Sequence, residues 1–227
     1  KTYLKTFSSS GYFLTKTFTL VLWFITFITQ HALGQLTDNF SDGDFTNSPG
    51  RPDPLGFYHK RLNQLQLNST VAGTSNLVVP FSFVALGDSE WKFNIRQTFS
   101  PSSTNFGRVY LLSDQSDPSS SLNGYYLQFG EAGSNDAVEL FRQTGLSSQS
   151  VCRAATAGGI ASAFNINVKV NRSSAGFWEL RIDYAGGTNF VLEGTATDNT
   201  HVSSAYFGLR CTYTITNATK FVFDDFE

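Results

Sequence analysis

The sequence predicts an all-β antiparallel sandwich of about a dozen strands. The clearest observation is period-two alternation. Between Phe164 and Val170 apolar residues alternate with asparagine and lysine, and residues 178–184 repeat the pattern. Such alternation is typical of strands that bury one face and expose the other. After residue 34 no stretch has the apolar spacing of an amphipathic helix. Twenty-two phenylalanines and only 15% charged residues indicate an aromatic core.

The predicted strands are separated by turns rich in glycine, serine, asparagine and aspartate. Ser173–Gly176 lies between two alternating segments and predicts a hairpin. The serine-rich segments 116–121 and 147–150 are predicted to be surface turns. In chain order, we expect strands over residues 91–99, 108–113, 125–131, 137–143, 164–170, 178–184, 189–194, 205–213 and 220–226.

Two acidic-aromatic strings of similar design lie at the ends of this domain, over residues 36–45 and 221–227. Their likeness predicts that the first and last strands lie side by side. Clustered carboxylates there supply the hard oxygen ligands that calcium prefers. The alternative is that these aspartates initiate turns and oppose edge-to-edge strand pairing. The candidate metal ligands are Asp38, Asp42, Asp44, Asp224 and Asp225.

Residues 1–34 have the features of a signal peptide. Lys16 precedes an apolar run over residues 18–28, and Ala32-Leu33-Gly34 offers small residues at a cleavage point before Gln35. The run is too short for the roughly 20 residues that span a bilayer as a helix. We therefore expect one exported β-sandwich domain over residues 35–227, secreted or at the cell surface. The alternative is a buried strand pair or an uncleaved anchor over residues 17–29.

Charge and cysteine content exclude several classes. The net charge is −2 and the basic residues are scattered singly, which excludes a typical nucleic-acid-binding protein. Cys152 and Cys211 are the two cysteines, and an even number in an exported chain favours a disulfide between them. The alternative is two buried free thiols. Zinc is excluded because the cysteines have no nearby histidine partners.

Histidine is too scarce for nucleophile-histidine catalysis. His31 lies in the signal peptide, His59 in an irregular stretch and His201 in a polar turn. A glycan hydrolase would need two facing carboxylates, one of them a general acid with a raised pKa. Residues 179–183 carry alternating charges and are interpreted as a solvated ion-pair ladder. Glu131 and Glu139 flank a loop and form a weaker candidate pair. We expect no enzyme activity.

Sugar recognition needs exposed aromatic rings beside polar side chains. Alternation places Tyr126 and Gln128 on the outer face of one strand, with Arg108 and Tyr110 beside them on its neighbour. These four are the candidate ligand-binding residues. The alternative is that both tyrosines cover the outer surface of the sheet or pack under a loop. The tryptophans at positions 91 and 178 align with core residues and are assigned to structure.

Several motifs occur in the order seen in one known family. They are residues 36–45, 108–114, 124–131, 139–142 and 218–226. Together they resemble the amino-terminal module of exported Bacteroidetes surface proteins that use type IX secretion and contain lamin-tail domains. The resemblance implies a concanavalin-A-like or laminin-G-like jelly roll and a chain that continues beyond Glu227, but no established chemistry. Residues 48–62 depart from the family's pattern. Our hypothesis is that this stretch is translated out of frame.

We therefore expect a non-catalytic secreted binding or adhesion module of a larger cell-surface protein, with carbohydrate as the candidate ligand. The expected partners are a polysaccharide or cell-surface glycan and the downstream domains of the same polypeptide. No cofactor other than calcium is expected. The alternatives are a jelly-roll glycan hydrolase or lyase, and a structural spacer domain.

Overall fold

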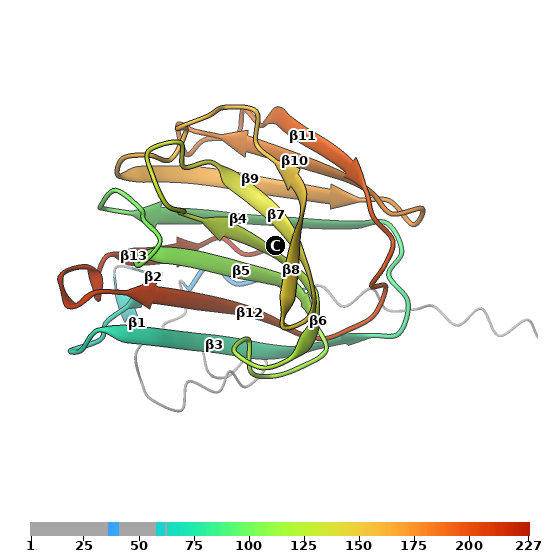
Figure 1. The fold of residues 1–227 in the computed structure, drawn as a ribbon, viewed down its shortest axis with the longest axis horizontal. Coiled ribbons are helices and arrows are strands. Elements are labelled where there is room, and N and C mark those ends of the chain that lie inside the picture. Colours follow the sequence, from blue (N-terminus) through green and yellow to red (C-terminus); the bar gives the residue numbers. More distant parts are fainter. Residues whose placement is uncertain (1–35, 41–57, 62) are drawn as a thin grey trace, which may run out of the picture. The chain divides into compact units, whose positions relative to one another are not determined.

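Two antiparallel sheets pack face to face in the computed structural model of the chain (Figure 1). The structure describes residues 36–40, 58–61 and 63–227. Within these residues, thirteen strands and one short 3-10 helix, η1 (Ile215–Asn217), make up the regular structure. No helix in the described part is long and apolar enough to cross a membrane. The predicted signal peptide lies outside the described residues.

One sheet has seven strands within the described residues. Its central pair is β4 and β9, which align in full antiparallel register from Ser89 opposite Arg172 to Gln97 opposite Phe164. The hairpin predicted around Ser173 joins β9 to β10. The order across the sheet is β1 (Tyr58–Arg61), β2 (Gln64–Leu67), β13 (Phe221–Asp224), β4 (Ser89–Gln97), β9 (Phe164–Arg172), β10 (Phe177–Asp183) and β11 (Val191–Thr197).

The other sheet has six strands in the same part of the chain. The order is β3 (Gly73–Phe83), β12 (Ser204–Tyr213), β5 (Phe106–Ser113), β6 (Leu122–Phe129), β7 (Val138–Gly145) and β8 (Ser147–Arg153). The prediction of a surface turn at residues 147–150 is wrong, because these residues begin β8. The strand lies at a sheet edge and its first four side chains are exposed, so it lacks the apolar alternation that signals a half-buried strand.

Aromatic side chains from both sheets fill the core. The ring of Phe93 on β4 meets that of Phe129 on β6 at a centroid distance of 6.1 Å. Tyr125 on β6 packs against Trp178 on β10 at 4.7 Å. Trp91 and Trp178 are both buried, as predicted. These contacts join the two sheets, and burial of each large ring contributes roughly 2–3 kcal/mol of transfer free energy.

The two ends of the domain lie side by side, as the matched acidic-aromatic strings predict. Asp38 and Phe226 form an antiparallel bridge in which each backbone N–H donates to the other residue's carbonyl, at 2.9 and 3.0 Å. Phe226 is buried and its ring contacts that of Phe40 at 6.0 Å. The aromatic members of the strings that the structure describes, Phe40, Phe221, Phe223 and Phe226, therefore belong to the core.

The predicted disulfide is absent from the described part of the chain, which includes both cysteines. Cys152 on β8 and Cys211 on β12 are buried free thiols. Three strands lie between β12 and β8 in the six-stranded sheet. Four strand spacings of about 4.8 Å give roughly 19 Å, whereas a disulfide needs Cα atoms within about 7 Å of one another. The alternative of two buried thiols holds in this fold.

Candidate functional site on the seven-stranded sheet

The four predicted ligand-binding residues come together on the outer side of the six-stranded sheet. Arg108 lies opposite Gln128, and Tyr110 lies opposite Tyr126, on β5 and β6. Both tyrosine rings are covered, however, with exposed fractions of 0% and 1%. The Tyr110 hydroxyl donates to the carbonyl of Pro118, which belongs to the loop between the two strands. Neither ring offers a free face to a sugar, and the alternative of packing under a loop describes Tyr110.

The polar pair beside these rings is also occupied. Nε of Arg108 donates to Oε1 of Gln128 at 2.9 Å, and its guanidinium lies 4.4 Å from the centroid of the Tyr126 ring. The amide of Gln128 donates to the carbonyl of Gly130. Phe141 stacks on Tyr126 from the next strand. Tyr110, Tyr126 and Leu122, with Phe141 packed against them, form a small second core outside the main one.

The predicted metal ligands at the domain ends carry structural hydrogen bonds. Asp38 accepts from the backbone N–H of Phe40, and Asp224 accepts from the side chain of Gln64 and the backbone N–H of Asp225. Burial, followed by the charges of Asp225 and Asp38, raises the pKa of Asp224. Within the described residues, no three His, Cys, Asp or Glu side chains are placed to hold a metal ion. Asp42 and Asp44 lie outside the described part.

The two carboxylates predicted to converge across a hairpin both bind Arg153. Its guanidinium forms ion pairs with Glu131 and, at 2.7 Å, with Glu139. The hydrogen bond that Arg153 donates to Glu131 is the largest of the interactions that raise the pKa of Arg153. His201, predicted to be an exposed turn residue, is half-buried, and its ring lies 2.9 Å from the Thr144 hydroxyl. These contacts assign structural roles to Glu131, Glu139 and His201.

A more extensive set of polar side chains covers the outer surface of the seven-stranded sheet. The alternation that points tryptophan, phenylalanine, isoleucine and valine into the core points asparagine, lysine, glutamate and arginine outward. The strand register then aligns these residues in rows across the sheet. In the described part of the chain this polar face consists of Gln64, Glu90, Lys92, Asn94, Arg96, Asn165, Asn167, Lys169, Asn171, Glu179, Arg181 and Asp224.

One row of the polar face consists of three cations. Lys92 lies opposite Lys169, which lies opposite Arg181. Like charges in this position repel one another, and each cation has a carboxylate partner. The charged atoms are 2.8 Å apart for Lys92 and Glu227, 3.2 Å for Lys169 and Glu90, and 3.0 Å for Arg181 and Glu179. The predicted ion-pair ladder over residues 179–183 is therefore present between Glu179 and Arg181.

A cluster of amides occupies the neighbouring row. The side-chain nitrogen of Asn94 donates to the side-chain oxygens of Asn165 at 3.0 Å and Asn167 at 2.7 Å. Asn167 in turn donates to the carbonyl of Gly187. These bonds fix the orientation of the amides before any ligand arrives. Preorganised amides that both donate and accept are suited to sugar hydroxyls.

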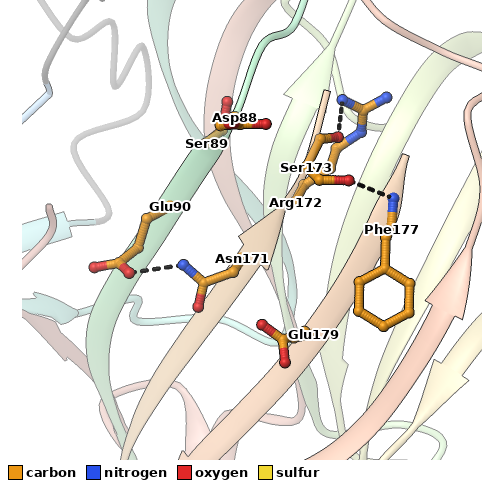
Figure 2. Close-up of a pocket in the computed structure, with 8 residues that line it drawn as sticks. All are labelled: Asp88, Ser89, Glu90, Asn171, Arg172, Ser173, Phe177 and Glu179. Atoms are coloured by element: carbon orange, nitrogen blue, oxygen red, sulfur yellow. Dashed lines mark hydrogen bonds between the residues drawn. The ribbon is translucent and has the colours of Figure 1, made fainter. Parts of the chain in front are cut away.

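A pocket of about 520 Å³ lies at one end of the polar face (Figure 2). Glu90, Asn171 and Glu179 come from three adjacent strands and lie in one row. Nδ2 of Asn171 donates to Oε2 of Glu90 at 2.7 Å. Phe177 is 44% exposed. In Figure 2 the Glu179 carboxylate lies between the Asn171 side chain and the Phe177 ring. The remaining lining residues are Asp88, Ser89, Arg172 and Ser173.

The turn from β9 to β10 fixes the position of Phe177. Its backbone N–H donates to the Ser173 hydroxyl at 3.1 Å. Gly176 has a φ of 82°, and a Cβ atom there would lie 2.7 Å from the Cβ of Asn199. Only glycine fits this turn without strain. The exposed ring is therefore held by a rigid hairpin.

The two glutamates of the pocket are ion-paired, and Glu90 is unsuited to general acid catalysis. Burial on its own would raise the pKa of Glu90, but the hydrogen bond from Asn171 and the Lys169 ammonium lower it below its ordinary value. A glycosidase acid requires the opposite shift. The arrangement is suited to binding through charge and hydrogen bonds.

The sequence predicted the strands of this face, but only residues 179–183 were interpreted as solvated surface, and the polar members of the other strands were given no role. One available signal was the identity of those residues: along β9 the outward positions are asparagine or lysine only. The rows themselves depend on register, which one sequence does not reveal.

Comparison with known proteins places the fold. No protein-family model matches the chain, and no curated protein matches it. Among solved structures, the carbohydrate recognition domain of Emp47p is similar at 12% identity, with a TM-score of 0.61 over 84% of this chain and 90% of that one. Lectin I-B4 from Griffonia simplicifolia, in its metal-free form, is similar at 10% identity and a TM-score of 0.57, covering 84% and 96%.

A legume lectin-like domain from Entamoeba histolytica is similar at 10% identity and a TM-score of 0.53, covering 78% of this chain and 87% of that one. Identities this low establish the fold alone. The chain therefore has the lectin-like antiparallel jelly-roll sandwich that the sequence predicts.

Proposed function

We propose that this chain is a non-catalytic carbohydrate-binding module that binds a glycan across the polar face of the seven-stranded sheet. The observation that carries the proposal is the set of ordered rows of amides and paired charges on β4, β9 and β10. The similar solved structures include proteins described as a carbohydrate recognition domain and a lectin, which supports the same function.

The polar face has the chemistry that polyhydroxylated ligands require. Asn165 and Lys169 are partly accessible, and their neighbours hold them in place. Because these groups are already ordered, a sugar that binds them costs little further side-chain entropy. Phe177 adds an apolar ring at one end, on which the C–H face of a pyranose can stack.

The location of the module is part of the proposal. The first 34 residues have the pattern of a signal peptide, which supports secretion. The resemblance to exported Bacteroidetes proteins supports a place at the amino end of a larger cell-surface protein. In that setting the module would attach its downstream domains to a polysaccharide or cell-surface glycan.

A glycan array followed by calorimetry tests the function. We expect the wild-type domain to bind at least one class of polysaccharide. The double variant Asn165→Ala/Arg181→Ala, which removes two side chains of the polar face outside the pocket, should weaken this binding about tenfold or more. The matched control Gln149→Ala changes an exposed residue of β8 in the other sheet and should bind as wild type. Absence of binding to any polysaccharide, or full binding by the double variant, would refute the proposal.

A further inference from the structure

The pocket beside Phe177 has an excess of negative charge among its described lining residues. Asp88, Glu90 and Glu179 contribute three carboxylates, and Arg172 contributes one guanidinium. One oxygen of Asp88 accepts from the backbone N–H of Ser174 at 2.6 Å. The carboxylates of Glu90 and Glu179 lie in the same row as the amide of Asn171.

Of the nearby cations, one is buried and two lie outside the pocket lining, where they pair with Glu90 and Glu179. Arg172 is 1% exposed, and its guanidinium is bonded to the carbonyl of Ser173 and the side chain of Asn199. It also lies 5.5 Å from the centroid of the Trp178 ring, inside the protein. Lys169 and Arg181, the partners of the two glutamates, lie one row further along the sheet.

The pocket also carries an aromatic ring, which a bare cation would not use, beside an amide oxygen. The Phe177 ring is 44% exposed, so it can cover the apolar face of a sugar ring. Asn171 donates through its nitrogen to Glu90, which leaves its side-chain oxygen as an acceptor (Figure 2). A ligand with an ammonium group on a pyranose ring would use the carboxylates, the amide oxygen and the aromatic ring together.

We propose that this pocket binds an amino-sugar unit with a free ammonium group, as the charge-selective end of the glycan site proposed above. The ammonium lies between the Glu90 and Glu179 carboxylates and donates to the side-chain oxygen of Asn171. The pyranose ring stacks on Phe177, and Asp88 strengthens the negative potential at the pocket rim. An acidic sugar is repelled by the same carboxylates, and an N-acetylated sugar has no charge for them to hold.

Binding of matched oligosaccharides to the wild-type domain tests this assignment without relying on any variant. The probes are a glucosamine hexamer, an N-acetylglucosamine hexamer, a glucose hexamer of the same β-1,4 linkage, and spermine. We expect the glucosamine hexamer to bind about tenfold or more tightly than the two uncharged hexamers. Its affinity should also fall with added salt, whereas theirs should not. Spermine should bind weakly, because it has no ring to stack on Phe177.

Variants then locate the effect. Glu90→Gln and Glu179→Gln are close in shape to the native residues and should abolish the preference for glucosamine. Phe177→Ala should weaken all three hexamers. The control Glu131→Gln, in the loop between β6 and β7, should change none of them. An unchanged amide NMR spectrum away from each mutation shows that the fold is intact.

Three outcomes would overturn the assignment. Equal affinity for charged and uncharged hexamers ends it and leaves glycan binding by the polar face intact. Spermine that binds as tightly as the glucosamine hexamer also ends it, in favour of a general polyamine site. If the array and every hexamer show no binding, both proposals fail.

Discussion

The indole rings of Trp91 and Trp178 stack on one another beneath the polar face, with centroids 5.8 Å apart and planes 15° from parallel. Trp91 follows Glu90 on β4, and Trp178 precedes Glu179 on β10. The stacked pair therefore supports, from inside the core, the two strands that present the pocket glutamates. Nε1 of Trp178 also donates to the carbonyl of Asp198 at 2.8 Å.

This arrangement predicts unequal effects for two adjacent aromatic residues. Trp178→Ala should lower the free energy of unfolding by roughly 3–5 kcal/mol, because it leaves a cavity beside Trp91 and Tyr125. Phe177→Ala should change it by about 0.5 kcal/mol or less, because the ring is largely outside the core. Urea unfolding of both variants measures the difference. Equal destabilisation would show that Phe177 is a packing residue.

We expect the free energy of unfolding to fall in acid because of the carboxylate of Asp198. Burial on its own would raise the pKa of Asp198, but the hydrogen bond from Tyr125, those from Thr200, and the Arg142 charge lower it below its ordinary value of 3.8. A lowered pKa in the folded state stabilises the fold above the unfolded pKa, and this contribution is lost as the pH falls through the folded pKa.

Asp198→Asn should therefore cost roughly 2 kcal/mol at neutral pH. The difference in free energy of unfolding between wild type and variant should become smaller below about pH 4, because the carboxylate of Asp198 becomes protonated there and the variant has no such group. Urea unfolding at neutral pH and at about pH 3 measures both differences. If this difference in free energy of unfolding stays constant with pH, the Asp198 carboxylate is not the cause of the loss of stability in acid.

The two thiols should remain reduced in the folded protein, even under oxidising conditions. Titration with a thiol reagent after unfolding, without added reductant, should find two free thiols per chain. Burial raises the pKa of Cys211 to about 12, so the folded protein should react slowly. Protein that contains a disulfide between Cys152 and Cys211 would contradict the order of strands in the six-stranded sheet.

The pairing of the domain ends predicts that Phe226 is a core residue. Its ring contacts those of Phe93 at 5.7 Å and Phe207 at 5.4 Å, so Phe226→Ala should destabilise the fold by roughly 3–5 kcal/mol. Asp225→Asn, at the exposed neighbouring position, is the control and should stay within about 0.5 kcal/mol. Similar unfolding midpoints for both variants would show that the end pairing contributes little.

The sequence was most informative where one face of a strand is buried. The alternation around Phe93, Val168 and Leu180 predicted β4, β9 and β10 with the correct inward faces. It was least informative at the six-stranded sheet's outer side. There Tyr110 and Tyr126 satisfied the alternation rule for exposed residues, but the loop that contains Pro118 contacts Tyr110, and Arg108 and Phe141 cover Tyr126. Strand periodicity does not predict how a loop folds back over a sheet.

The candidate site was also beyond what strand periodicity in the sequence can predict. The sequence separates Glu90, Asn171 and Glu179 into three strands, and only the register between β4, β9 and β10 aligns them in one row. The cysteine count favoured a disulfide that the fold does not contain. A count carries no information about which strands are neighbours. The sequence shows the residues of the pocket and the two cysteines, but it does not show which strands pair with one another.

An amide NMR titration with the tightest-binding oligosaccharide of the array tests the central claim most directly. If the polar face binds glycans, the backbone signals of β4, β9 and β10 should shift together, with the largest changes around Asn171. Those of β5 and β6 around Arg108 and Gln128 should remain in place. Shifts confined to the six-stranded sheet, or no shifts with any oligosaccharide, would contradict the claim.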